Sequence, residues 1–267
     1  MKILSFDVGG TKIAWALLDA NGQFLSEVNK TSTPTTSSEI EQIFRTAAQQ
    51  YEFDAFALAT AGVVNNNIVL EKPNNLPAGY EKINMADICQ TPYIIENDAN
   101  AATWAEYRIG ELKNVQQGVL LTIGTAVGCG LICNGMLMRG KIGAAGEYDF
   151  KFSGRDLQKL AQDYSLAKKD CFAIYDLYKQ KNNQAEIAYK QWENRLIDGL
   201  QMLNRLLDIE VIALSGSLAQ IVDYEFVNAA ITEKEWRNPP KIVAAKCLNN
   251  AGMVGAALLC INKMKGV

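Results

Sequence analysis

The hexapeptide DVGGTK, residues 7–12, lies between two largely apolar runs, one ending at Phe6 and the other starting at Ile13. This pattern predicts a strand, a tight turn and a second strand. The adjacent Gly9 and Gly10 let backbone N–H groups approach an anion closely, so the turn could hold a phosphate. An ordinary hairpin turn, with glycine supplying a positive φ, fits the hexapeptide equally well. Later segments of the chain decide between these two interpretations.

A second strand-turn-strand pattern of the same kind covers residues 121–130. Gly124 and Thr125 lie in its turn, where backbone N–H groups and a threonine hydroxyl can donate to phosphate oxygens. A third turn of small residues is centred on Gly216, directly after the short apolar run 211–214, and could cover the adenosine part of a nucleotide. Each such turn alone is more often structural, but three of them in one chain favour nucleotide binding.

A carboxylate lies between the first two turns, in the segment ENDANAA at residues 96–102. Asp98 is expected at the junction between a strand and a helix, where it could take a proton from an alcohol during phosphoryl transfer. The competing interpretation makes Asp98 only the N-cap of that helix. We favour the catalytic role, because Asn97 adds a second polar group at the same strand end.

Strand, hairpin and helix patterns occur in both halves of the chain and predict an α/β fold of two similar domains. The first domain is expected to cover residues 1–112 and to be completed by residues 248–267, and the second to cover residues 113–247. Long amphipathic helical patterns occur at residues 154–180 and 184–207. A ligand is expected in the cleft between the domains, where binding sites commonly lie.

Local patterns give further detail near the N-terminus. Residues 23–28 are predicted as a third antiparallel strand, and residues 31–38 as a polar connection. Ser38, followed by Glu41, predicts a capping box at the start of a helix that reaches about Tyr51.

The composition limits the classes of partner. The 267 residues include 26 basic and 29 acidic side chains, and no basic run could follow a nucleic-acid backbone. No apolar stretch reaches the length of a membrane span. The six cysteines are scattered and no signal peptide precedes them, which favours a cytoplasmic location. Cys129 and Cys133 fit a buried strand better than a zinc site, because the chain has no histidine.

Taken together, these segments resemble the ROK family (repressor, open reading frame, kinase), whose fold is a pair of actin-like ATPase, or ribonuclease H-like, domains. The resemblance covers most of the chain. Residues 7–12 are similar to the first phosphate hairpin of the family, residues 96–102 to its catalytic segment and residues 124–128 to its second phosphate motif. Residues 143–147 resemble the segment whose acidic residue holds sugar hydroxyls, and residues 72–76 the loop whose asparagine contacts the sugar.

The resemblance implies transfer of the γ-phosphate of ATP to the 6-hydroxyl of a hexose or an N-acylhexosamine, by a homodimer that uses ATP and Mg²⁺. Asp98 would be the general base, and Asp7 would face the magnesium ion through a water molecule. The residues expected to bind the sugar are Asn97, Glu147, Asn74, Asn75 and Gly62. The residues expected to bind ATP are Asp7, Gly9, Gly10, Thr11, Lys12, Gly124, Thr125 and Gly216.

The sequence departs from the family pattern directly after Glu147. Most relatives carry a Gly-His pair and then a Cys-x-Cys-Gly zinc-binding segment there, whereas this chain continues with residues 148–152, YDFKF. We therefore expect no zinc, and the identity of the sugar stays open because the missing histidine normally helps to hold it. Ala126 also replaces a usual glycine.

Two substrates fit the resemblance. Residues 60–67 and 104–107 are similar to N-acetylmannosamine kinases, whereas Glu147 is more similar to glucokinases. We favour N-acetylmannosamine, because a sugar pocket without the zinc segment suggests a sugar other than glucose. A glucokinase and a non-catalytic sugar-binding or regulatory protein are the alternatives. The regulators of the family carry an N-terminal helix-turn-helix domain, for which the start of the first hairpin at Asp7 leaves no room.

Overall fold

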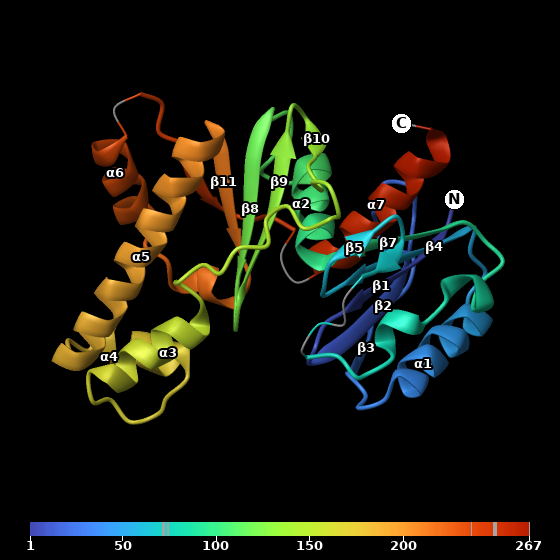
Figure 1. Ribbon diagram of the computed structural model, residues 1–267, viewed down its shortest axis with the longest axis horizontal. Coiled ribbons are helices and arrows are strands. Elements are labelled where there is room, and N and C mark those ends of the chain that lie inside the picture. The colour runs from blue at the N-terminus through green and yellow to red at the C-terminus, as the bar shows by residue number, and fades with distance from the viewer. Residues whose placement is uncertain (71–72, 74, 236, 248–249, 267) are drawn as a thin grey trace.

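The computed structural model describes residues 1–70, 73, 75–235, 237–247 and 250–266. This part of the chain contains two five-stranded sheets, with helices α2 (Asp98–Ile109) and α7 (Ala251–Lys265) between them (Figure 1). Further helices cover the outer face of each sheet (Figure 1). The predicted α/β fold with two similar halves is therefore confirmed.

The first sheet has the spatial order β3-β2-β1-β4-β7. Its strands are β1 (Ile3–Val8), β2 (Lys12–Leu18), β3 (Asn29–Ser32), β4 (Ala55–Thr60) and β7 (Tyr93–Asn97). The first three strands are antiparallel, whereas β4 and β7 run parallel to β1. The register pairs Val8 with Thr60, and Thr60 with Asn97, so the carboxyl ends of the parallel strands lie at one edge. That edge carries Asp7 and Asp98.

The second sheet repeats this arrangement in the order β10-β9-β8-β11-β12. Its strands are β8 (Gln117–Ile123), β9 (Val127–Cys133), β10 (Met136–Leu137), β11 (Val211–Ser215) and β12 (Lys241–Ala244). Strands β8, β9 and β10 are antiparallel, and β11 and β12 run parallel to β8. Thr122 pairs with Ser215, which places the turn at Gly216 beside the second glycine turn. A small separate ladder joins β5 (Val64–Asn65) and β6 (Ile68–Val69).

The two helices between the sheets contact each other through very small residues. A Cβ atom on Gly255 of α7 would lie 1.6 Å from the carbonyl oxygen of Ala101 in α2, so only glycine fits there. Helix α7 also packs on β1 and β4 of the first sheet. This packing supports our proposal that residues 248–267 complete the domain formed by residues 1–112.

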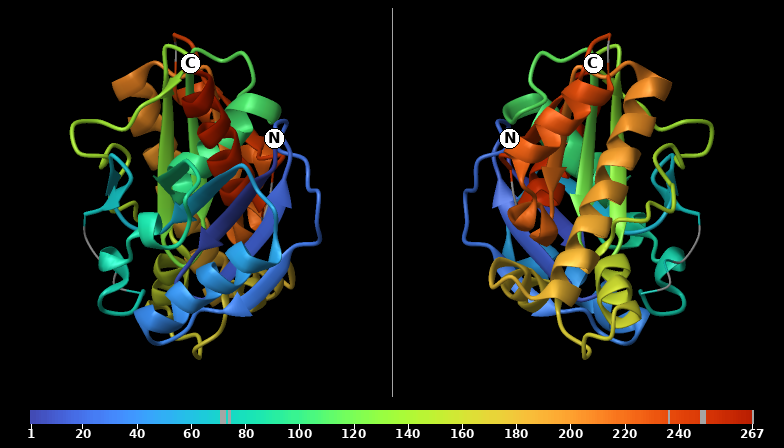
Figure 2. Two further views of the ribbon diagram at one scale, coloured as in Figure 1. Left: turned by 90° about the vertical axis from the view of Figure 1, so that its right-hand side faces the viewer. Right: turned by 90° about the vertical axis from the view of Figure 1, so that its left-hand side faces the viewer.

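The outer helices bury one apolar face each. Helix α1 (Ser37–Gln50) buries Ile40, Phe44 and Ala47 over the first sheet, where Phe44 meets the rings of Phe6 and Phe56. The helices around the second sheet are α3 (Gly154–Asp163), α4 (Cys171–Lys179), α5 (Asn183–Leu207) and α6 (Tyr224–Lys234) (Figure 2). The short 3-10 helices are η1 (Tyr80–Lys82), η2 (Met85–Asp87) and η3 (Ser217–Ile221). No helix within the described ranges is both long and apolar enough to cross a lipid bilayer.

Two of the local predictions were wrong. The third antiparallel strand is β3, residues 29–32, and of residues 23–28 only Phe24 forms a bridge, to Leu18. An exposed edge strand of polar residues carries no alternating apolar pattern, which is why it was assigned to a connection. The cap of α1 is Thr36, which accepts from the backbone N–H of Glu39 at 3.3 Å. The same Ser/Thr-x-x-Glu spacing occurs at both positions, and the structure uses the earlier one.

Candidate functional site

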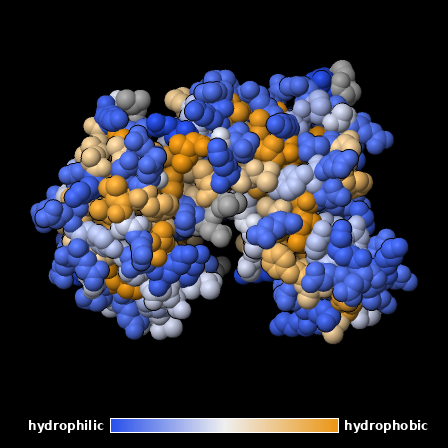
Figure 3. Space-filling view, turned by 180° about the vertical axis from the view of Figure 1, so that it is seen from behind, coloured by the Kyte–Doolittle hydropathy of each residue, from blue (hydrophilic) through white to orange (hydrophobic). Residues whose placement is uncertain are grey.

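A cavity of about 540 Å³ opens between the two halves of the molecule, at the hollow visible in Figure 3. Its walls come from both sheets, from the start of α2 and from the loop before Glu147. The residues that line it are Ala61, Gly62, Val63, Pro73, Asn75, Asn97, Asp98, Ala99, Thr122, Ala126, Val127, Gly128, Cys129, Gly146 and Glu147. The interdomain cleft predicted from the sequence is therefore present, and four of the five predicted sugar-binding residues lie in it. The fifth, Asn74, lies outside the described residues.

A second, smaller cavity of about 180 Å³ adjoins the first. It is lined by Asp7, Asp98, Ala99, Ala102, Thr122, Ser215, Gly216, Ala251 and Gly252. Asp98, Ala99 and Thr122 line both cavities. Asp98 thus lies where a group in the larger cavity would meet a group in the smaller one.

The local structure leaves the carboxylate of Asp98 available. The N-cap of α2 is Asn97, whose Oδ1 accepts from the backbone N–H of Asn100 at 3.0 Å. Asp98 is the first residue of the helix, and its Oδ1 accepts from the N–H of Ala99 at 2.8 Å. Burial raises the pKa of Asp98 above its ordinary value. Asn97 therefore does the capping that the competing interpretation assigned to Asp98.

An ion pair between a buried glutamate and a partly exposed arginine holds the strand end that carries Asp98. Glu96 is 2% exposed, and its Oε2 accepts from the Nε of Arg139 at 2.6 Å. Its Oε1 accepts from the N–H of Asn97 at 3.1 Å and from the Nδ2 of Asn100 at 3.2 Å. The backbone oxygen of Arg139 in turn accepts from the N–H of Ala145, close to Glu147. One arginine thus connects the segments that carry the two cleft carboxylates, Asp98 and Glu147, and this residue was not predicted from the sequence.

The larger cavity carries polar groups suited to a sugar. Burial, and secondarily the charge of Asp98, raises the pKa of Glu147. The Nδ2 of Asn97 donates to the carbonyl oxygen of Gly62 at 3.0 Å, so both amide atoms of Asn97 are held by the protein. The side chain of Asn75 lies against the first glycine hairpin, since a Cβ on Gly10 would come within 2.2 Å of its Nδ2. Direct contacts from these residues to a sugar stay predictions.

The carboxyl group of Asp7 and its surroundings suit a magnesium ion that is held mainly by phosphates. Burial, and secondarily the charge of Asp98, raises the pKa of Asp7 to about 7. A cation would offset the cost of ionising Asp7, and Mg²⁺ is typically bound by one or two carboxylates together with substrate phosphates. Gly252 keeps space beside this carboxyl, because a Cβ there would lie 3.0 Å from its Cγ. Within the described residues no three His, Cys, Asp or Glu side chains are grouped as metal ligands, and the expected lack of zinc stays a prediction.

The predicted ATP-binding residues are only partly gathered at these cavities. Asp7 and Gly216 line the smaller cavity. Gly9 closes the first hairpin by donating to the carbonyl oxygen of Lys12 at 3.0 Å. The predicted residues that line neither cavity are Gly9, Gly10, Thr11, Lys12, Gly124 and Thr125. Their contacts with a nucleotide remain predictions.

Thr122, which lines both cavities, was not among the residues predicted from the sequence. Its hydroxyl lies opposite Gly128, where an added Cβ would be 2.5 Å from Oγ1. The available signal was a single polar residue near the end of an otherwise apolar strand, next to the second glycine turn.

A family model described as the ROK family matches residues 3–149 and 148–263 of the chain. This protein belongs to the ROK family. The match spans the strands of both sheets and confirms the family predicted from the glycine turns and the Asp98 segment.

Several relatives show what this ROK protein is similar to. An N-acetylmannosamine kinase of Haemophilus influenzae (strain 86-028NP) is 27% identical over 290 residues, which cover 96% of this chain and 94% of the relative. A ROK family glucokinase from Streptomyces griseus, solved in complex with glucose and AMPPNP, is 26% identical with a TM-score of 0.76 and covers 97% of this chain and 99% of its own. A ROK family protein from Streptococcus pneumoniae TIGR4, solved in complex with sucrose, is 23% identical over the whole of both chains, with a TM-score of 0.88 that shows the shared fold.

Proposed function

We propose that this ROK protein is an ATP-dependent sugar kinase that phosphorylates the 6-hydroxyl of a hexose or an N-acylhexosamine. The observation that carries the proposal is the position of Asp98, which lines both the cavity with Glu147 and Asn75 and the cavity with Asp7 and Gly216. An alcohol in the first cavity and a triphosphate in the second would meet at this carboxylate.

In this proposal the protein supplies position, charge and a proton acceptor. The sugar ring lies in the larger cavity, where Glu147 and Asn75 can bind its hydroxyls, and Asp98 accepts the proton of the 6-hydroxyl. A pKa raised by burial makes Asp98 a better base than an exposed aspartate, provided that it is still ionised at the working pH. Magnesium, held by Asp7 and the phosphates, would neutralise phosphate charge. Closure of the two halves would exclude water from the transfer.

N-acetylmannosamine is the substrate we propose first. The similarity to N-acetylmannosamine kinases over nearly the whole chain supports it, as does the YDFKF sequence that replaces the usual zinc segment. The similarity to a glucokinase that binds glucose supports the alternative. Glu147, which lines the larger cavity, favours the same alternative.

The test is a coupled assay of ADP release with glucose, N-acetylmannosamine, N-acetylglucosamine, mannose and fructose. We expect the highest kcat/KM with N-acetylmannosamine, and exclusive turnover of glucose would contradict that choice. Binding of a sugar in calorimetry, without ADP release for any of the five, would identify the non-catalytic alternative.

The role of Asp98 is tested by Asp98→Asn, with the exposed Asp163→Asn as the matched control. We expect Asp98→Asn to lower kcat by about 10²–10⁴-fold, because the alcohol loses its base, while the fold is retained. Asp163→Asn should keep wild-type kcat. Near-normal turnover by Asp98→Asn would refute the assignment of the base.

A further inference from the structure

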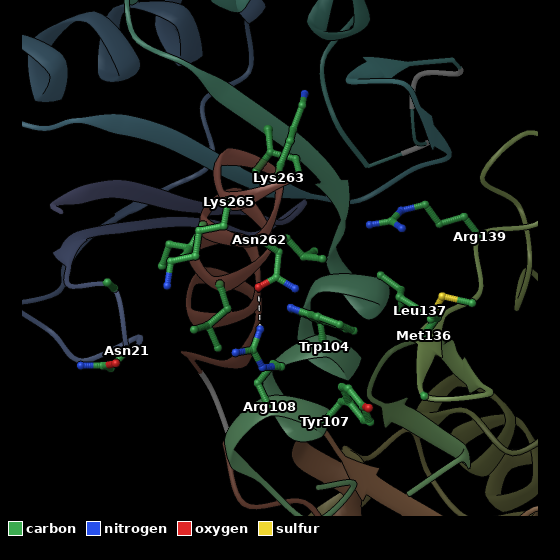
Figure 4. Close-up of a pocket in the computed structure, with 16 residues that line it drawn as sticks. Asn21, Trp104, Tyr107, Arg108, Met136, Leu137, Arg139, Asn262, Lys263 and Lys265 are labelled. Atoms are coloured by element: carbon green, nitrogen blue, oxygen red, sulfur yellow. Dashed lines mark hydrogen bonds between the residues drawn. The ribbon is translucent and has the colours of Figure 1, made fainter. Parts of the chain in front are cut away.

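A third cavity, of about 870 Å³, lies beside the C-terminal half of α7 and shares no lining residue with the two catalytic cavities (Figure 4). Its walls come from α2, α7, the turn at Asn21 and the segment that starts at Gly135. The residues that line it are Ala20, Asn21, Ile94, Trp104, Tyr107, Arg108, Gly135, Met136, Leu137, Arg139, Leu258, Leu259, Ile261, Asn262, Lys263 and Lys265. The proposed kinase reaction gives this cavity no role.

The charged residues of this cavity all have one sign. Its cations are Arg108, Arg139, Lys263 and Lys265, and none of the described residues that line it is acidic. Arg139 pairs with Glu96, but the other three cations have no carboxylate within 4.0 Å among the residues that the structure describes. The chain as a whole has a net charge of −3, so this concentration of cations does not reflect the average composition. Such a set attracts anions.

An aromatic ring and a cation lie together in the wall of the cavity. Trp104 is 8% exposed, and its indole Nε1 is buried without an acceptor. Figure 4 shows the Trp104 ring at the centre of the cavity, between α7 and the Met136–Leu137 strand. The guanidinium of Arg108 lies 5.6 Å from the centre of that ring and donates to the Oδ1 of Asn262 at 2.6 Å. The Trp104 ring and the neighbouring Arg108 guanidinium, rather than the enclosed indole Nε1, are the groups that this wall offers to a ligand.

The remaining walls are apolar. Leu137, Leu258 and Ile261 join Trp104 and Tyr107 to form a surface that suits a flat or ring-shaped body. The volume lies in the range of about 300–1,000 Å³ that is typical of small-molecule sites.

We propose that this cavity binds a small organic phosphate that carries a ring, with the phosphate near Arg108 and Lys265 and the ring against Trp104. Arginine and lysine side chains are the usual phosphate ligands of proteins. The chemistry is shared by hexose phosphates and nucleoside monophosphates, and the test separates them.

The test is isothermal titration calorimetry with glucose 6-phosphate, adenosine 5′-monophosphate and phenyl phosphate, and with inorganic phosphate and phenol as the separate parts. The variant is Lys263→Gln/Lys265→Gln, which changes only exposed side chains of α7. The matched control is Lys168→Gln/Lys169→Gln, in the exposed loop between α3 and α4. Calorimetry measures binding without turnover, and the α7 variant separates binding in this cavity from binding in the two interdomain cavities, whose lining residues it leaves unchanged.

We expect at least one of the three ring-bearing phosphates to bind the wild type more tightly than either separate part. The α7 variant should weaken that binding by about tenfold or more, because charge-assisted hydrogen bonds are lost, while the control variant binds like the wild type. The ligand whose affinity is lower for the α7 variant than for the wild type shows whether the cavity binds a hexose phosphate or a nucleoside monophosphate.

Three outcomes would overturn the proposal. They are the absence of binding at millimolar concentrations, equal affinities for the wild type and the α7 variant, and a dimer in solution that the α7 variant dissociates. The last outcome would show that a second copy of the chain covers the cavity.

Discussion

At the scale of single residues, the cleft gathers carboxylates, and one of them raises the pKa of two others. Asp98 contributes to the raised pKa of both Asp7 and Glu147, and burial is the larger cause in each case. Buried carboxylates of this kind lower the free energy of unfolding of the metal-free protein. Cations, and ligands that donate hydrogen bonds, offset this loss of stability. Stability and activity should therefore respond in opposite directions when one of these charges is removed.

Asp7→Asn tests this opposition. The pKa of Asp7 is about 7 in the folded protein, against an ordinary value of 3.8, so the folded state binds more protons between these pH values. The protonated Asp7 carboxyl stabilises the folded state fully below about pH 4, and this stabilisation is lost as the pH rises through 7. In metal-free protein, Asp7→Asn should be more stable than the wild type at pH 8, by on the order of 2–4 kcal/mol, and the difference should shrink towards pH 5.

Urea unfolding of metal-free protein at the two pH values measures this difference, with Asp163→Asn as the exposed control. Asp7→Asn should also lose most kinase activity. A gain in stability that is equal at both pH values would contradict the assigned pKa.

Arg139 and Glu96 should be strongly coupled. Arg139→Gln leaves Glu96 buried without its cation, so we expect a loss of about 1–3 kcal/mol, less than for a fully buried pair because the arginine side chain is 42% exposed. Glu96→Gln/Arg139→Gln should recover much of this loss, because no isolated charge remains. Chemical denaturation of the two single variants and the double variant gives the coupling energy, and additive effects would exclude the proposed interaction.

At the scale of elements, the contact between α2 and α7 depends on the absence of side chains. Gly255→Ala places a methyl group 1.6 Å from the oxygen of Ala101, so the helices must separate. We expect a loss of about 1–3 kcal/mol or more, as for other overpacked cores. Met264→Ala, on the exposed last turn of α7, is the control and should change stability little. Thermal unfolding measures both, and an unchanged melting temperature for Gly255→Ala would show that the contact is looser than described.

The same scale shows what the sequence could and could not predict. Glycine turns between apolar strands predicted both hairpins, and the polar residues after β7 predicted the start of α2 at Asp98. These signals are local, because turn chemistry and strand ends are encoded over a few residues. The polar edge strand β3 and the short helix α6 carry little apolar periodicity and were missed.

Long-range features of the site had no local signal. Glu96 and Arg139 are 43 residues apart and meet only because the two sheets pack around α2. Thr122 enters the site through its pairing with Ser215 on the neighbouring strand, which the chain order does not specify. Residue type suggested the chemistry of Asp7 and Asp98, whereas the fold determines which groups surround them.

At the scale of the whole molecule, the proposed sugar side and the proposed phosphate side of the cleft share a contact. Asn75 lines the larger cavity, and its side chain lies against Gly10 of the first hairpin. A sugar that orders Asn75 should therefore strengthen the binding of a non-hydrolysable ATP analogue. We expect an increase in affinity of about 5–20-fold in the wild type, within the usual range of coupling between sites.

Asn75→Ala should reduce this coupling, with the exposed Asn194→Ala of α5 as the control. Titration of the analogue with and without saturating sugar measures it in each variant. Equal coupling in Asn75→Ala and the wild type would show that the two ligands communicate by another route.

The crossing of α2 and α7 has a consequence for how the molecule moves. Because Gly255 carries only a hydrogen atom at this point, the backbones of α2 and α7 approach each other closely where the two halves of the molecule meet. We expect rotation of the two halves about this contact to change the width of the cleft while the distance between α2 and α7 at Gly255 stays fixed. Substitutions that add a side chain at Gly255 should therefore alter the rate of product release, although this residue does not contact the product.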